Sequence, residues 1–326
     1  LAYHALKKAV EKSKAKAGSI VVIKSKTGEV LAIADVPSYN PNNRRDYSPE
    51  RSRNRAATDT FEPGSTIKPF SALEALESGK YTMDTVVDTL DGQLNVDGYI
   101  IKEHGKKYGR IPLSEIIKKS SNVGIARVAM SLPPNDLFSV LRRFGFGAST
   151  FSGFPGEVGG RLVAPDVWKD ANVAALSFGY GIATTTLQLA QAYNVLASHG
   201  VKHPTSLLAL NEVVPEGEEV FNHDNVDALM SALHEVVTAS GTGRRARVDG
   251  YLVAGKTGTA YIAGSKGYDE HARHYMASFV GMLPYPDPEL VIAVVIRDPV
   301  NGHYGGQIAA PVFAKVASGI MRFMED

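Results

Sequence analysis

Hydrophobic residues follow two different patterns along the chain, and each pattern predicts a different kind of element. Near both ends, short apolar runs bounded by glycine, proline or other turn residues predict β-strands. In the middle, apolar residues recur every three or four positions, which predicts amphipathic helices. The predicted strands are 19–24, 29–34, 251–260, 275–283 and 290–297, and the predicted helices are 1–16, 112–119, 122–130, 135–144, 185–198, 224–239 and 310–324, with one more after Pro63.

Strands at both ends around a helical middle predict an α+β fold with segregated elements. We expect one antiparallel sheet assembled from both termini and flanked by helices, with an inserted all-helical lobe. The sheet lobe would take residues 1–60 and 240–326, and the helical lobe 61–239, within a single domain of 326 residues. The cleft between the lobes is the expected place for a site. Residues 37–55, rich in proline, asparagine and arginine, predict an exposed loop.

Composition removes several classes of function. The chain has 35 Lys and Arg against 34 Asp and Glu, and it has no cysteine. Disulfides, thiolate metal sites and a cysteine nucleophile are therefore excluded. A net charge near zero argues against a dedicated nucleic-acid binder. The longest apolar runs, such as 290–296, are far shorter than the ~20 residues of a membrane-spanning helix.

A first candidate for chemistry is the pair Ser65 and Lys68, which follows a Pro-Gly step at a predicted helix start. Unpaired backbone N–H groups at a helix start favour negative charge. Lys68 shares a helix face with Ser65, and a partly desolvated lysine can take the proton of a hydroxyl. A capping serine followed by an exposed lysine explains the pair equally well, and the same spacing recurs at Ser13 and Lys16.

Two further motifs are equally short. Ser120 and Asn122 lie between predicted helices, where capping is the plain explanation. The run 256–259, Lys-Thr-Gly-Thr, lies on a predicted strand, and a strand glycine allows close approach of a ligand backbone. Each motif has a second copy elsewhere in the chain, at 38–40 and 52–54 for Ser-x-Asn and at 26–28 for Lys-Thr-Gly.

The order of the three motifs distinguishes one set from these copies. Ser-x-x-Lys at a helix start, then Ser-x-Asn, then Lys-Thr-Gly on a late strand resembles the penicillin-binding proteins and serine β-lactamases. The runs 18–32, 177–181 with 187–190, and 304–313 also resemble this family, so the likeness extends from about residue 18 to the end. It is strongest to class B penicillin-binding proteins of the septal, cell-division type, and it implies the transpeptidase fold of that family.

The resemblance implies acyl transfer from D-alanyl-D-alanine of peptidoglycan stem peptides, without metal or cofactor. Ser65 would be the nucleophile and Lys68 its base. The backbone N–H groups of Ser65 and Thr259 would stabilise the oxyanion. The other implied roles are proton relay to the leaving group for Ser120 and Lys256, an amide contact for Asn122, and substrate binding for Thr257, Gly258, Thr259, Tyr275 and Tyr304, with His303 a weaker candidate.

The resemblance also implies partners and a location. β-Lactams would acylate the same serine, and a glycan polymerase with other division proteins would be the working partners. The catalytic domain would lie in the periplasm, held to the inner membrane by an anchor outside this chain, which begins at Leu1. Nucleic acid is not an expected partner.

Related activities stay open. A D-Ala-D-Ala carboxypeptidase or a serine β-lactamase would share the acylation step, and a non-catalytic β-lactam sensor would share the fold. The Glu-x-x-x-Asn run from Glu50 to Asn54, a pattern of class A β-lactamases, precedes Ser65 and is in the wrong order.

Two other patterns have plain explanations. His199 and His203 have the spacing of a metal pair, but Gly200 and Pro204 would break the helix, which predicts a solvated loop. The basic run 244–247 predicts a solvated turn, with attraction to anionic cell-wall polymers as the alternative.

Overall fold

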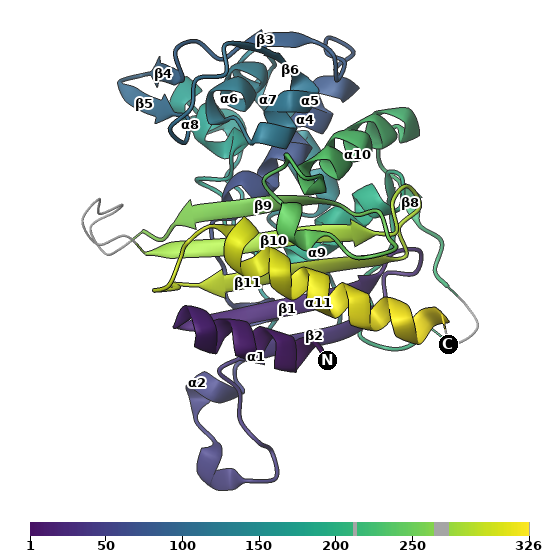
Figure 1. The fold of residues 1–326 in the computed structure, drawn as a ribbon. Helices are drawn as coiled ribbons and strands as arrows, with labels where there is room; N and C mark the ends of the chain where they lie inside the picture. Colours follow the sequence, from purple (N-terminus) through teal and green to yellow (C-terminus); the bar gives the residue numbers. More distant parts are fainter. Residues whose placement is uncertain (211–213, 264–273, 326) are drawn as a thin grey trace.

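A five-stranded antiparallel sheet forms the centre of the protein (Figure 1). The computed structural model describes residues 1–210, 214–263 and 274–325. The strand order is β2-β1-β11-β10-β9, so the two ends of the chain meet where β1 pairs with β11. This confirms the predicted α+β fold with a sheet built from both termini. The strands are β1 (Ala17–Lys24), β2 (Val30–Val36), β9 (Ala254–Tyr261), β10 (Tyr275–Leu283) and β11 (Leu290–Arg297).

Both faces of the sheet are buried, because alternate residues of each strand pack into different cores. Ile20 and Val22 of β1 pack with α1 (Ala2–Ser13) and α11 (Gly305–Glu325), which lie across one face in Figure 1. Val21 and Ile23 pack on the opposite side, in the core shared with α9 (Thr186–Ala197) and the inserted lobe. A strand buried on both sides reads as a continuous apolar run, as β1 and β11 do.

The inserted lobe consists mainly of helices. Its helices are α4 (Lys68–Glu77), α5 (Leu113–Lys119), α6 (Asn122–Met130), α7 (Pro134–Phe144), α8 (Asp170–Ser177) and α10 (His223–Val237), with the short turns η2 (Gly64–Ile67) and η3 (Pro165–Val167). The short helices before this lobe are η1 (Arg44–Asp46), α2 (Pro49–Ser52) and α3 (Arg55–Thr58), and η4 (Arg244–Ala246) follows it. Within the described ranges, no helix combines the length and apolarity needed to cross a membrane.

The expectation of an all-helical lobe needs correction, because this part of the chain also holds short strands. They form the pairs β3 (Val86–Asp88) with β6 (Arg110–Pro112), β4 (Gln93–Val96) with β5 (Tyr99–Lys102), and β7 (Val201–Lys202) with β8 (Glu218–Glu219). Most of their residues are exposed or half-buried and the strands span two to four residues. Such strands are too short to show a two-residue hydrophobic period.

The last helix begins earlier than predicted, at Gly305 instead of residue 310, so that Pro311 lies inside it. Tyr304 accepts the first backbone hydrogen bonds of α11, from Gln307 and Ile308. A Cβ on Gly305 would lie 2.1 Å from the carbonyl oxygen of Ser278 in β10. The glycine therefore lets the start of α11 contact the sheet directly, a constraint that local pattern does not express.

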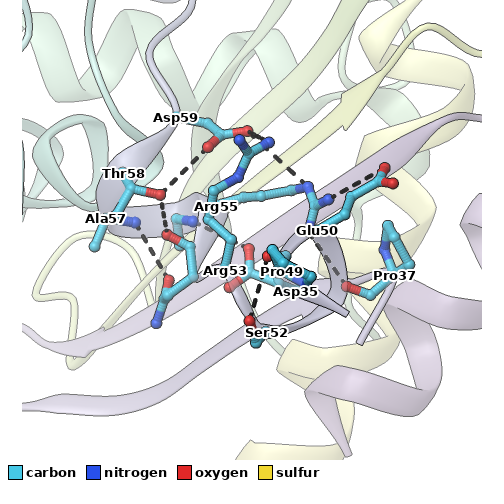
Figure 2. A network of polar contacts seen from close by, with 12 residues as sticks. Asp35, Pro37, Pro49, Glu50, Ser52, Arg53, Arg55, Ala57, Thr58 and Asp59 are labelled. Carbon is cyan, nitrogen blue, oxygen red and sulfur yellow. Dashed lines mark hydrogen bonds and ion pairs between the residues drawn. The ribbon is translucent and has the colours of Figure 1, made fainter. Parts of the chain in front are cut away.

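Residues 37–54 project from the body as an arm containing η1 and α2 (Figure 1). The buried guanidinium of Arg55 lies where the arm rejoins the body (Figure 2). It donates to the carbonyl oxygen of Pro37 at 3.3 Å and lies 3.7 Å from Glu50 and 4.0 Å from Asp59. One cation thus ties both ends of the arm to the sheet, while the arm itself is exposed as predicted.

Candidate active site

Ser65 lies in the 3₁₀ turn η2, which runs without a break into α4, whose first residue is Lys68. Ser65 is 9% exposed, and the Lys68 side chain is fully buried. Lys68 follows Ser65 by one turn, as the sequence predicted. The exposed-lysine explanation of this motif is therefore excluded.

The turn that carries Ser65 is held by close backbone packing. Gly64 has a φ of +56° and donates its N–H to the carbonyl oxygen of Gly179 at 3.1 Å. A Cβ on Gly179 would lie 2.1 Å from the Gly64 carbonyl oxygen, so this approach requires glycine. The buried Tyr193 hydroxyl donates to the Thr66 carbonyl oxygen at 2.8 Å. The run 177–181, noted for its resemblance, thus supports the turn that carries Ser65.

The second motif lies at the junction of α5 and α6, where Ser120 adopts a left-handed φ of 61°. This conformation ends α5 and directs the Ser120 backbone and hydroxyl toward α4. Lys68 Nζ contacts the Ser120 carbonyl oxygen at 2.6 Å, Asn122 Oδ1 at 2.6 Å and Ser120 Oγ at 3.1 Å. The two shorter contacts use both hydrogens of a neutral amine, which leaves its lone pair as a proton acceptor.

The third motif lies on β9, the edge strand next to the inserted lobe (Figure 1). The buried Lys256 side chain donates to Ser120 Oγ at 2.9 Å and to the Thr257 carbonyl oxygen at 3.2 Å. Ser120 Oγ therefore lies within hydrogen-bond distance of two lysine amines, one from each of the other motifs. The structure brings all three motifs together.

Burial sets the protonation of both lysines, because it disfavours the charged amine. Burial lowers the pKa of Lys68 well below its ordinary value of 10.5; the nearby Lys256 lowers it further, and Glu103 opposes the shift. Burial alone lowers the pKa of Lys256 to about 7. Burial therefore favours the neutral amine at both positions, and a neutral amine is what a base requires.

Glu103 is a site residue that the sequence did not reveal. Its buried carboxylate accepts hydrogen bonds from the Ser121 hydroxyl, from the Asn122 N–H at 2.9 Å and from the Val123 N–H at 3.1 Å. These donors form the first turn of α6, where a carboxylate is favourable. Glu103 thereby fixes the position of Asn122, yet no local pattern connects a residue after β5 with the start of α6.

Two adjoining cavities meet at Ser65 and Thr259, with volumes of about 400 Å³ and about 600 Å³. The smaller one is also lined by Ser120 and Thr257. Aromatic residues line the larger cavity. They include the predicted candidates Tyr275 and Tyr304 and the weaker candidate His303. His303 stacks against Tyr275 with ring centroids 4.6 Å apart. The second copies of the motifs, at 13–16, 26–28, 38–40 and 52–54, line neither cavity.

Gly258, the glycine of the third motif, packs against other parts of the protein and not against the cavities where a ligand backbone was expected. Gly258 is absent from the residues lining either cavity. A Cβ there would lie 2.3 Å from Ser278 Oγ, 2.8 Å from Thr66 Cγ2 and 3.0 Å from the Pro63 carbonyl oxygen. The glycine therefore lets η2 pack directly on β9, which brings Ser65 beside Thr259. The groups that approach Gly258 closely are thus the side chains of Ser278 and Thr66 and the Pro63 backbone.

The threonines of the third motif face the smaller cavity. Thr259 Oγ1 accepts the N–H of Gly305 at 3.1 Å, so its own hydrogen remains available to donate. Thr257 Oγ1 lies 3.1 Å from Thr242 Oγ1. Two hydroxyl donors beside each other suit an anionic group of a ligand.

The basic run after the helix α10 also borders this cavity. Arg244 and Arg245 are exposed, as a solvated turn predicts, and both line the cavity with His104 and Tyr108. The sequence identified the basic run but gave no signal that it would lie beside the serine, because η4 reaches the cavity through packing against α10 and α11, which are distant from Ser65 in the sequence.

The comparisons with known proteins agree with this geometry. Residues 18–318 match the family described as penicillin binding protein transpeptidase domain. The probable peptidoglycan D,D-transpeptidase PbpC of Pseudomonas aeruginosa is 42% identical over 325 residues, which cover 99% of this chain and 56% of that protein. The peptidoglycan D,D-transpeptidase FtsI of Escherichia coli K12 is 39% identical over 325 residues, with 99% and 54% covered.

The chain spans about half the length of these curated relatives. Among solved structures, the apo TP domain of Burkholderia pseudomallei penicillin-binding protein 3 superposes with a TM-score of 0.90 at 38% identity, covering 99% of this chain and 93% of that one. The predicted penicillin-binding fold is thereby confirmed. The chain belongs to the penicillin-binding protein transpeptidase family.

Proposed function

We propose that residues 1–326 are the single catalytic domain of a peptidoglycan D,D-transpeptidase of the septal type. The observation that carries this proposal is the convergence of two buried lysines on Ser120, next to the cavity that Ser65 lines. The family membership and the relatives named above support the same reaction. The substrate would be a stem peptide ending in D-alanyl-D-alanine.

Acylation comes first. Ser65 Oγ attacks the carbonyl carbon of the penultimate D-alanine, and its proton passes to the neutral amine of Lys68. The oxyanion is held by the backbone N–H groups of Ser65 and Thr259, each worth ~3–4 kcal/mol when preorganised. The C–N bond then breaks, and Ser120 with Lys256 supplies the proton that the departing D-alanine needs. The product is an ester on Ser65.

Deacylation transfers the peptide. The amine of a neighbouring stem peptide attacks the ester carbonyl, loses a proton to the same relay, and forms the new amide as Ser65 regains its proton. Asn122 would hold an amide of the donor peptide, and the Thr257 and Thr259 hydroxyls would bind its terminal carboxylate. Tyr275 and Tyr304 would line the donor or acceptor channel. A β-lactam would acylate Ser65 in the same way.

The wider setting follows from the same proposal. A septal enzyme of this kind would act with a glycan polymerase and other division proteins. It would work in the periplasm, attached to the inner membrane by sequence outside this chain.

Ser65→Ala tests the assignment. We expect this variant to lose covalent labelling by a fluorescent penicillin and the matching mass increase in intact-mass spectrometry. Ser13→Ala is the matched control, because Ser13 has the same Ser-x-x-Lys spacing but lies in α1. Labelling of Ser65→Ala at the unchanged rate would refute the nucleophile.

Product analysis separates the related activities. With a D-Ala-D-Ala peptide and an added amine acceptor, a transpeptidase forms the new amide. Release of D-alanine with hydrolysis alone would identify a carboxypeptidase, and rapid turnover of a penicillin would identify a β-lactamase.

A further inference from the structure

Two histidines and an aspartate come together on the surface where α9 ends and α10 begins. His199 follows α9, His223 is the first residue of α10, and Asp227 lies one turn further along α10. One ligand atom from each lies within 4.8 Å of the others, and no other such group occurs in the part of the chain that the structure describes. None of the three lines the active-site cavities. The proposed reaction therefore gives them no role.

The Asp227 carboxylate lies between the two imidazoles. Its Oδ1 is 2.6 Å from His199 Nδ1, and its Oδ2 is 3.4 Å from His223 Nδ1. The two rings are nearly parallel, with centroids 4.9 Å apart and planes at 13°. Both Nδ1 atoms thus face the same carboxylate, and His223 and Asp227 have the i, i+4 spacing that lets two side chains of a helix reach one ion.

A further carboxylate is placed on the opposite side of His199. Asp287 Oδ1 lies 3.6 Å from His199 Nε2, and Asp287 Oδ2 accepts a hydrogen bond from Lys26 Nζ at 2.8 Å. In the metal-free chain the 2.6 Å contact places a hydrogen on His199 Nδ1, donated to Asp227. When zinc takes the place of that hydrogen, the tautomer with its hydrogen on Nε2 is the one that Asp287 favours. Metal-binding histidines commonly have such a carboxylate partner on their other nitrogen.

We propose that His199, His223 and Asp227 bind a zinc ion, with Asp287 and Lys26 orienting His199. Imidazole nitrogen and carboxylate oxygen suit zinc, and three protein ligands leave a coordination position for water. Tetrahedral ligands at ~2.0–2.1 Å from zinc lie ~3.3–3.5 Å from each other. The contacts would therefore adjust by roughly 1 Å, with Asp227 moving away from His199 and toward the ion.

Access and charge are compatible with this site. The side chains of His223 and Asp227 are 60% and 44% exposed, so an ion can reach them from solvent. The start of α10 disfavours a cation only weakly, and coordination by imidazole outweighs it. Zinc would join the end of α9, the start of α10 and, through Asp287, the turn between β10 and β11.

By spacing alone, the sequence offers His199 and His203 as a metal pair. His203 has the spacing of a metal partner for His199, but it follows the short strand β7 and lies outside the cluster. A Cβ on Gly217 would contact its ring at 2.9 Å, so His203 packs against the β8 side of that hairpin. The partner of His199 is instead His223, which is distant in the sequence.

Calorimetric titration of the whole chain with Zn²⁺ tests the proposal, and the visible absorption of bound Co²⁺ reports the ligand set. We expect one saturable site with a rise in the melting temperature on zinc binding. His223→Ala and Asp227→Asn should abolish this binding. Asp287→Asn should weaken it by ~10–100-fold, as expected for a residue that orients a ligand. His203→Asn and His4→Ala are the matched controls and should bind zinc as the unchanged chain does.

Penicillin acylation should be unaffected by His223→Ala in the absence of added metal, so this test is independent of the proposed reaction. Absence of saturable zinc binding would overturn the proposal. So would binding that persists in both His223→Ala and Asp227→Asn, or binding that His203→Asn removes.

Discussion

Replacing Glu103 by alanine removes the acceptor that holds the start of α6. Three donors lose their partner, namely the Ser121 hydroxyl and the backbone N–H groups of Asn122 and Val123. Ser121 and Val123 are fully buried, whereas Asn122 is half-buried and can bind water. Two buried donors would therefore be left unpaired.

The cost follows from those two donors. An unpaired buried donor costs ~1–3 kcal/mol, and loss of a helix cap costs ~1 kcal/mol. These contributions overlap, so we expect Glu103→Ala to lower the free energy of unfolding by ~2–4 kcal/mol. Glu103→Gln keeps the side-chain volume and one acceptor oxygen, so it should cost less.

Glu103→Gln should also change the chemistry. The Glu103 charge raises the pKa of Lys68, against the larger lowering by burial and by Lys256. Loss of the charge should lower that pKa, so the acid limb of the acylation rate profile should move to lower pH. The maximal rate should fall, because Asn122 and through it Lys68 lose their fixed position.

Urea unfolding and acylation by a fluorescent penicillin, measured across pH, give both quantities. Glu115→Gln is the control, since its contacts with Lys118 and Lys119 are on the surface and such pairs contribute ~0.3–0.5 kcal/mol. If Glu103→Ala stayed within ~0.5 kcal/mol of the unchanged chain, as surface substitutions do, and kept its acylation profile, the reasoning would be refuted.

Three further predictions concern the same centre. Gly258→Ala should separate β9 from η2 and reduce acylation with the fold retained, since its Cβ would lie 2.8 Å from Thr66 Cγ2 and 3.0 Å from the Pro63 carbonyl oxygen. Ser278→Ala should relieve only the further clash, at 2.3 Å from Ser278 Oγ of β10, and so only part of the loss; an unchanged rate in Gly258→Ala would contradict this account. Acylation should slow on acidification as Lys68 takes up a proton, and a rate that does not fall in acid would exclude Lys68 as the base. The free energy of unfolding should rise with pH from about 7 toward 10.5, because over that range the unfolded chain holds the Lys256 proton and the folded chain does not. Urea unfolding of Lys256→Met across pH should show a smaller rise. An equal rise would count against a depressed Lys256 pKa.

Much of the fold could be predicted from local pattern. β1 and β11 carry continuous apolar runs because both faces of the sheet are covered, and α10 carries a clear apolar face. The short strands of the inserted lobe could not be predicted, since their few half-exposed residues leave no period. The start of α11 was missed because it depends on the contact of Gly305 with β10.

The site divides in a similar way. Ser65, Lys68, Ser120, Asn122 and Lys256 could be named from residue type, order and family resemblance. Other residues of the site depend on where distant segments meet, which local spacing does not show. They are Glu103 beside the second motif, Gly179 beside the turn that carries Ser65, and Arg244 and Arg245 at the cavity rim.

The order of residues along the chain established most of the elements and the chemical inventory: two hydroxyls, two amines and an amide, in the order that one family uses. It also determined that thiol chemistry is absent. Which copy of each short motif takes part depends on tertiary packing, because Ser13 and Ser65 differ in surroundings and not in spacing. Packing also lowers the pKa of Lys68 and of Lys256, because it removes water from their amines and so disfavours the charged form.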